Sequence, residues 1–291
     1  MKTIIAATDF SDEARYAVER GAIVAKEQRA HLSLLHVLSS SALNDERKLS
    51  QTPTDAEAKL IDDAGRMLSE IAADIGSKTG LMGSTDIKIG RAQAEILSAT
   101  ESADLLVLGA HGRNFLHDLI LGTTAEHLLN KCKRPMLVTK CSPRTGYQRV
   151  LVPVDFSPYS ASALTMASRI APNARMTIVH AFRVPFEGRL RIVGALEDDI
   201  RQYREEEQRA AEKKIWELIR ESHVDADLIS YAVEGGDPSP VILAKAKEFL
   251  SDLIVIGKHG QSWIEDLLLG STTHHVLAHS ECDVLVVPKR V

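Results

Sequence analysis

The 291-residue sequence is poor in cysteine, in aromatic residues and in excess charge, and each shortage excludes a class of protein. Its three cysteines are an odd number without C-x-x-C spacing, which excludes a disulfide framework and a four-cysteine zinc site. No apolar run approaches the length of a membrane span, and the N-terminal run is too short for the core of a signal peptide. We therefore expect a cytoplasmic protein with reduced thiols.

The charge and the aromatic content limit the partners and the core. Lys and Arg total 35 against 40 Asp and Glu, a formal net charge of -5, which suits solubility and suits neither a nucleic-acid groove nor an anionic membrane. We expect no nucleic-acid and no membrane partner. Hydrophobic residues are 44% and charged residues 26%, as in ordinary globular proteins, and aromatics at 4% predict an aliphatic core.

The chain contains one unit twice. GAHGRNFLHDLILGTT (109–124) and GKHGQSWIEDLLLGST (257–272) agree at 8 of 16 positions. At nearly the same offset IIAATDFS (4–11) pairs with VLVPVDFS (150–157), and ADLLVLG (103–109) with SDLIVIG (251–257). A fixed long period indicates repeated structural units. We predict two domains, 1–143 and 147–291, with Pro143 and Gly146 in the linker.

Short aliphatic runs alternate with longer segments of helical periodicity in each half. Leu60 to Ile75 and Ile200 to Ile219 each place apolar residues on one helical face. Ser11 is a good N-cap, and Pro158 after Ser157 suits a first helical position. Strands that are apolar throughout are buried on both faces, which indicates a parallel sheet between helices. The predicted fold is α/β, with two doubly wound five-stranded parallel-sheet domains related by a pseudo-two-fold axis.

In such sheets ligands bind beyond the carboxyl ends of the strands, where Asp9, Asp155 and the glycine motifs lie. The missing Cβ lets a backbone approach a ligand closely, and a helix that opens after the last glycine favours a phosphate. The alternative is that these glycines are turn residues and the hydroxyl residues are helix caps. The repeated motif comprises Gly109, Gly112, Gly122, Thr123 and Thr124 in the first half, and Gly257, Gly260, Gly270, Ser271 and Thr272 in the second.

On these motifs the sequence resembles the universal stress protein family, whose ATP-binding members carry G-x2-G-x9-G-[S/T] after the fourth strand. The resemblance covers nearly the whole chain twice and includes DFS after the first strand, LLHV or IVHA in the second strand, and the closing aliphatic strand. It implies a Rossmann-like fold of the adenine nucleotide alpha hydrolase type. The sequence looks like a tandem member, whose halves stand in for the homodimer of single-domain relatives.

The resemblance also implies a nucleotide site in each half. Asp9 and Asp155 would lie beside the nucleotide, and the backbone at Val37 and Ala181 would border the adenine. The glycine motifs would approach the ribose and hold the phosphates of ATP or another adenine nucleotide, with Mg2+. The second half has the fuller pattern, because Pro153, the Gly236–Pro238 element and Lys258 stand where the first half has Ala7, Ala92 and Ala110.

Two histidine arrangements raise other chemistry. His111 and His259 lie inside the glycine motifs, and no nucleophile or second acid accompanies them, so we expect binding or structural roles and assign no catalytic residue. No Walker loop occurs. His275, His279 and Cys282 have i, i+4, i+7 spacing, which would suit zinc, but the simpler interpretation is a helix end followed by a strand. We assign no metal site there.

The expected function is binding of an adenine nucleotide as a regulatory or sensing ligand in the stress response. A nucleotide-free interaction scaffold with an unidentified protein partner and a weak ATPase are the alternatives. The last strands, Met136 to Thr139 and Val284 to Val287, are aliphatic, and an exposed edge of that kind would aggregate. We therefore expect the halves to pair through these strands, and a homodimer is a further expectation.

Overall fold

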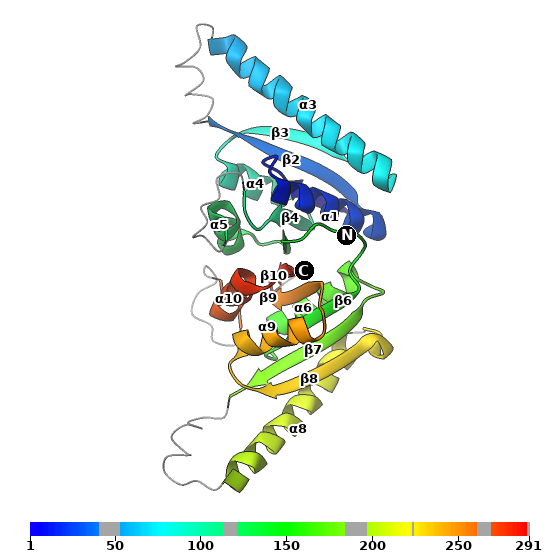
Figure 1. Ribbon diagram of the computed structural model, residues 1–291, viewed down its shortest axis with the longest axis vertical. Helices are drawn as coiled ribbons and strands as arrows, with labels where there is room; N and C mark the ends of the chain where they lie inside the picture. Colours follow the sequence, from blue (N-terminus) through cyan, green and yellow to red (C-terminus); the bar gives the residue numbers. More distant parts are fainter. Residues whose placement is uncertain (41–52, 113–120, 184–196, 223, 261–268, 290–291) are drawn as a thin grey trace. The chain divides into compact units, whose positions relative to one another are not determined.

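The computed structural model describes residues 1–40, 53–112, 121–183, 197–222, 224–260 and 269–289. The chain divides into two compact units, Met1–Gly146 and Tyr147–Val291. In Figure 1 the first runs from blue to green and the second from green to red.

The first unit alternates strands with helices along the whole of its described chain. Its elements are β1 (Thr3–Ala7), α1 (Asp12–Gln28), β2 (His31–Ser39), α3 (Pro53–Thr79), β3 (Ser84–Gly90), α4 (Ala92–Thr100), β4 (Leu105–Gly109), α5 (Thr123–Lys131) and β5 (Met136–Thr139). All its strand pairs are parallel, in the order β3-β2-β1-β4-β5.

Over its described residues the second unit repeats this plan with one added 3-10 turn. Its elements are β6 (Arg149–Pro153), α6 (Pro158–Ile170), β7 (Arg175–Phe182), α8 (Glu197–Ser222), η1 (Ala226–Leu228), β8 (Ile229–Gly235), α9 (Pro238–Glu248), β9 (Leu253–Gly257), α10 (Ser271–His279) and β10 (Asp283–Val287). Its strands are also parallel, in the order β8-β7-β6-β9-β10. The prediction of a parallel α/β fold is confirmed.

The strand order fixes where a ligand can bind. From β1 the first unit continues to β2 and β3 on one side, and then crosses to β4 and β5 on the other. The order therefore reverses between β1 and β4, and loops that leave these two strands diverge above their carboxyl ends. The second unit has the same reversal between β6 and β9.

The core is aliphatic, as the composition predicts. Ile4, Leu32 and Leu105 on adjacent strands of the first unit are fully buried, and their counterparts in the second unit's sheet, Val150, Met176 and Leu253, are buried as well. Burial of each such side chain contributes about 1.5–3 kcal/mol. The helical faces expected from periodicity are partly observed: Ala64, Leu68 and Ile75 of α3 are buried, while Leu60, Met67 and Ile71 are half-buried.

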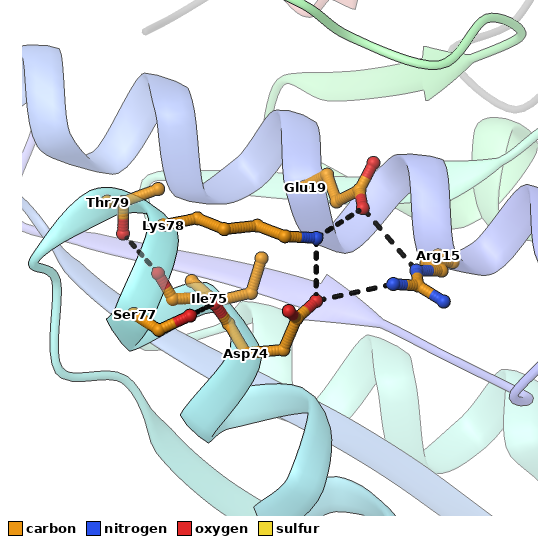
Figure 2. Close-up of polar contacts among 7 residues, drawn as sticks. All are labelled: Arg15, Glu19, Asp74, Ile75, Ser77, Lys78 and Thr79. Atoms are coloured by element: carbon orange, nitrogen blue, oxygen red, sulfur yellow. Dashed lines mark hydrogen bonds and ion pairs between the residues drawn. The ribbon is translucent and has the colours of Figure 1, made fainter.

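The helices α1 and α3 of the first unit are joined by four alternating charges (Figure 2). Asp74 Oδ2 accepts hydrogen bonds from Lys78 Nζ at 2.8 Å and Arg15 Nη2 at 3.3 Å. Glu19 Oε1 of α1 lies 3.4 Å from Arg15 Nε and 3.6 Å from Lys78 Nζ. Each cation therefore has two anionic neighbours, on different helices.

None of the helices in the described ranges has the length and apolar character that a membrane span requires.

Candidate functional site

A cavity of about 240 Å³ opens at the strand reversal of the first unit. Its walls are the carboxyl ends of β1, β2 and β4 and the first turns of α4 and α5, and they combine aliphatic side chains with glycine backbone. The lining residues are Ala7, Thr8, Asp9, Ala14, Leu35, Val37, Ala92, Ile96, Leu108, Gly109, Ala110, His111, Gly112, Gly122, Thr123, Thr124, Ala125 and Leu128. All eight first-half residues that the sequence singled out therefore line one cavity.

The carboxylate of Asp9 lies between the turn at Ser11 and the glycine loop at Gly112. Its Oδ1 accepts hydrogen bonds from the backbone N–H of Ser11 at 3.1 Å and from Ser11 Oγ at 2.6 Å. Ser11 is also the N-cap of α1, because its Oγ accepts a hydrogen bond from the Ala14 N–H. On the other side, Asp9 Oδ2 lies 2.6 Å from the place where a Cβ on Gly112 would stand. One carboxyl oxygen is thus fixed to the turn, and the other lies at the glycine loop.

The first and third glycines of the motif are explained by contacts inside the protein. A Cβ on Gly109 would lie 3.0 Å from the backbone C and O of Glu13, so its absence lets α1 pack against the end of β4. Gly122 donates a backbone hydrogen bond to the carbonyl of Ala110 at 2.9 Å, and a Cβ there would lie 3.3 Å from that oxygen. The close approach that the motif requires is first of all one between protein segments.

The start of α5 provides hydrogen-bond donors toward the cavity. The helix begins at Thr123, as the sequence predicts, and its N-cap is Gly122, which makes no side-chain cap hydrogen bond. The first N–H groups of a helix have no partner within the helix, and its dipole is positive at that end. Backbone of this kind suits an anion such as a phosphate.

The second unit places its predicted residues at the matching positions. The carboxyl ends of β6, β7 and β9 contain Pro153, Ala181 and Gly257. The loops after β6 and β9 carry Asp155, Lys258, His259 and Gly260. The N-cap and first turn of α10 are formed by Gly270, Ser271 and Thr272. Two contacts of the first unit recur: Asp155 Oδ2 lies 2.7 Å from a Cβ placed on Gly260, and Gly270 N–H donates to the Lys258 carbonyl at 3.0 Å.

Some side chains around the second site differ from those of the first. Lys258, expected to provide a cation, is 7% exposed, and its backbone N–H donates to the Val287 carbonyl at 2.8 Å. His259 makes an edge contact with the Tyr159 ring, with 5.2 Å between ring centroids. Thr273, which replaces Ala125, donates a hydrogen bond to the Gly257 carbonyl at 2.8 Å and so ties α10 to β9.

A different serine holds the carboxylate in the second unit. Asp155 Oδ1 accepts a hydrogen bond from Ser160 Oγ at 2.7 Å, and Ser160 occupies the position of Ala14. The Ser157 N–H still donates to Oδ1 at 3.0 Å. The Ser157 hydroxyl does not cap α6; it is buried and finds no hydrogen-bond partner among the described residues. The hydroxyl that holds the carboxylate therefore comes from Ser11 in the first unit and, in the second, from a serine three residues beyond the matching position.

Sequence reasoning missed the phenylalanine that follows each aspartate and the histidine that contacts its ring. Phe10 and Phe156 have φ of 64° and 62°, in the left-handed region that costs a residue with a side chain roughly 1–2 kcal/mol. Their rings lie 4.2 Å and 4.5 Å from the rings of His36 and His180, between centroids. The signal was present, because both halves carry Asp-Phe and a second-strand histidine at matching positions.

The histidines of α10 do not form the three-ligand set considered for zinc. The rings of His275 and His279 are stacked at 4.1 Å, and His279 Nδ1 lies 3.0 Å from the His275 carbonyl oxygen. Within the described ranges, no three or more His, Cys, Asp or Glu side chains are grouped so that they could hold a metal ion.

Comparisons with known proteins agree with this architecture. The profile of the universal stress protein family matches residues 1–140 and 146–288. A universal stress protein of Mycolicibacterium smegmatis is 26% identical over 293 residues, which cover 99% of this chain and 97% of that protein. Universal stress protein YxiE of Bacillus subtilis is 33% identical over 149 residues, or 48% of this chain and 99% of YxiE.

A solved structure shows the same fold over the full length. The crystal structure of a universal stress protein from Archaeoglobus fulgidus superposes with a TM-score of 0.72 at 22% identity, and the match covers 99% of this chain and 98% of that one. Two family matches fill most of the sequence, one in each unit. The chain therefore belongs to the universal stress protein family and carries two of its domains in tandem.

Proposed function

We propose that this protein binds ATP or a related adenine nucleotide as a regulatory or sensing ligand in the stress response. One observation carries the proposal: the eight first-half residues selected from the sequence line a single cavity beside the N-terminus of α5. These residues came from a motif that resembles that of ATP-binding members of the family. The equivalent residues of the second unit form the second proposed site.

The lining suits the different parts of a nucleotide. Leu35, Val37 and Ile96 offer an apolar wall, which suits the faces of an adenine ring. The N-terminus of α5 offers backbone donors to the phosphates, which explains how a protein of net charge -5 could hold a polyanion. The Asp9 carboxylate would accept hydrogen bonds from ribose hydroxyls.

Magnesium would enter with the nucleotide. It is usually bound through one or two carboxylates together with phosphate oxygens and water, and it seldom has a site made of protein ligands alone. Asp9 is a carboxylate that lines the cavity, and Oδ1 is already engaged by Ser11. Phosphate oxygens and water would therefore be the main magnesium ligands, with the Asp9 carboxylate beside them in the cavity lining.

Two measurements test the proposal on the full chain. The purified protein is denatured and the supernatant examined for released nucleotide by chromatography, and the Tm is recorded with and without ATP. A ligand at 100 times its Kd stabilises a fold by about 2.7 kcal/mol, which gives a readily measured rise in Tm. Absence of both released nucleotide and a rise in Tm would contradict the proposal and favour the scaffold alternative.

The site assignment has its own test. Changing Gly122 and Gly270 to Val should abolish ATP binding. Even a Cβ alone would lie 3.3 Å from the carbonyl oxygen of Ala110 or Lys258, and a branched side chain would force that backbone away. Retained binding would refute the site. Steady phosphate release that disappears in the combined Asp9→Asn and Asp155→Asn variant would instead support the ATPase alternative.

A further inference from the structure

The turn that carries each site aspartate has an unfavourable backbone conformation. Phe10 directly follows Asp9, and Phe156 directly follows Asp155, with φ of 64° and 62°. Only a few per cent of residues other than glycine adopt positive φ, and a phenylalanine gains nothing locally from it. Such conformations persist where surrounding contacts enforce them, and they concentrate at functional sites. The contacts that enforce this one are therefore informative.

One histidine contacts the turn on both sides of the aspartate. In the first unit, His36 Nδ1 lies 2.7 Å from the carbonyl oxygen of Thr8, the residue before Asp9. The His36 ring also lies against the ring of Phe10, the residue after Asp9, at 4.2 Å and an interplanar angle of 32°. A carbonyl oxygen only accepts hydrogen bonds, so the contact with Thr8 requires a proton on Nδ1.

The second unit repeats the arrangement with different neighbours. His180 Nδ1 lies 2.8 Å from the Val154 carbonyl oxygen, and its ring lies 4.5 Å from that of Phe156. Lys214 of α8 places its Nζ 5.3 Å from the centroid of the same phenylalanine ring. The histidine contacts are thus kept although the serine that holds the carboxylate differs between the units.

The histidine itself is set back from the cavity. His36 is absent from the cavity lining, whereas Thr8 and Asp9, the residues on which it acts, belong to it. The Thr8 N–H donates to the Leu35 carbonyl at 2.9 Å, and the Phe10 N–H donates to Thr8 Oγ1 at 3.1 Å, so the turn is bonded on each side of Asp9. Loss of the histidine would leave these bonds and the lining side chains in place, and would remove only the contacts with the Thr8 carbonyl and the Phe10 ring.

We propose that His36 and His180 are positioning residues for the nucleotide sites: each clamps the residues before and after the site aspartate, and thereby fixes its carboxylate without contacting the ligand. The effect on ligand affinity rests on the proposed function, whereas the effect on the turn does not. A turn without its clamp would allow the carboxylate several orientations, and affinity falls with the fraction of molecules in the competent one.

The binding arm uses the full chain and ATP as the probe. The variant His36→Phe with His180→Phe keeps an aromatic ring and loses the donor, and His36→Asn with His180→Asn keeps a donor and loses the ring. The Phe variant should bind ATP about tenfold more weakly, and the Asn variant should recover part of that loss. His31→Phe is the matched control, since His31 is an exposed residue at the other end of β2 that bonds to Ser84 Oγ.

A cycle with the aspartates separates positioning from general stability. If the histidines act through Asp9 and Asp155, the Phe variant should cause no further loss of affinity once both aspartates are Asn. Two results would overturn the inference and leave the proposed function intact. In one, the affinity losses of the Phe and the aspartate variants add fully; in the other, the wild type binds ATP and the Phe variant binds it equally well.

The second arm needs no nucleotide. Amide hydrogen exchange is followed at Ser11, whose N–H donates to Asp9 Oδ1, and at Leu106 in the centre of β4. His36→Phe should speed exchange at Ser11 about tenfold and leave Leu106 unchanged. If the wild type binds no ATP, the proposed function fails and this arm alone decides: a faster Ser11 supports the clamp, and an unchanged Ser11 overturns it.

Discussion

Asp9 Oδ2 occupies the space that a side chain on Gly112 would need, 2.6 Å from the position of its Cβ. Asp155 and Gly260 stand in the same relationship at 2.7 Å. Gly112→Ala should therefore displace the carboxylate and weaken ATP binding about tenfold, with a small change in Tm, since Ser11 still holds Oδ1. Isothermal titration of the single variants with ATP measures this.

The control for that substitution is Gly65→Ala in α3. A Cβ on Gly65 would lie 3.7 Å from Ile87 Cδ1, an ordinary contact, so alanine should bring only the helix-propensity gain of about 0.5–1 kcal/mol and leave affinity unchanged. Equal affinities for Gly112→Ala and the control would show that the carboxylate has no part in binding.

The first glycine of each motif should matter for stability more than for the ligand. Gly257→Ala would place a Cβ 2.6 Å from Tyr159 Cβ, and Gly109→Ala would place one 3.0 Å from the Glu13 backbone. Overpacking of this kind costs about 1–3 kcal/mol, and we expect the larger loss for Gly257→Ala. The stability of both variants is measured by urea unfolding. A midpoint equal to that of the wild type would show that α6, for Gly257→Ala, or α1, for Gly109→Ala, moves away from the new side chain without cost.

Stability should fall on mild acidification because of His180. Burial lowers the pKa of His180, while Asp155 and Glu207 favour its charged form and Lys214 opposes it. The unfolded chain, in which histidine has a pKa near about 6.5, then binds more protons than the folded one. The contribution of the neutral ring is complete above about pH 6.5 and is lost as the pH falls through the lower pKa of the folded state.

The measurement is urea unfolding at a series of pH values for the wild type and His180→Phe. Removal of the titrating group should make the dependence of the free energy of unfolding on pH shallower below about pH 6.5. If the free energy of unfolding varies with pH equally steeply in the wild type and in His180→Phe, groups other than His180 cause the dependence.

The charges between α1 and α3 should give a small stabilisation that depends on salt. The hydrogen bond from Lys78 lowers the pKa of Asp74, so this contribution is present above the unfolded pKa of about 3.9 and is lost as the pH falls further. Asp74→Asn should lower the Tm slightly at low salt and hardly at all at about 1 M NaCl.

Asp63→Asn is the matched control, because Asp63 pairs with Arg66 on its own helix, three residues away. It should cause the smaller change in Tm at low salt. A loss in Asp74→Asn that persists undiminished at high salt would point to packing and away from charge.

The aliphatic last strands predict how a separate half would behave. β5 ends the strand order of the first unit, and its residues Met136–Thr139 are uncharged. A fragment of residues 1–145 should therefore self-associate in solution, since an uncovered edge of this kind recruits another strand. Analytical ultracentrifugation of the fragment tests this prediction, and a soluble monomer would refute the expected pairing of the halves through these strands.

The repeat made most of the fold predictable. Alternating aliphatic runs and helical periodicity led to five parallel strands in each unit, and the glycine motif located the starts of α5 and α10. Helix lengths were less accessible: periodicity began at Leu60, but α3 starts at Pro53, because the first turns of a helix need not face the core.

The contacts behind the candidate site were harder to predict. His36 lies in an aliphatic strand, and nothing in the spacing shows that its ring reaches back to Thr8 and Phe10. The change of the serine that holds the carboxylate was likewise hidden, because Ser160 reaches Asp155 only once α6 has formed. Such contacts depend on strand register, which a single sequence reveals poorly.

The hydrogen bonds from Gly122 to Ala110 and from Gly270 to Lys258 have a consequence for protein engineering. Each bond joins the N-cap residue of α5 or α10 to the residue that follows β4 or β9, and both of its partners are main-chain atoms. A redesign of either site that changes side chains only should therefore keep this anchor of the helix start.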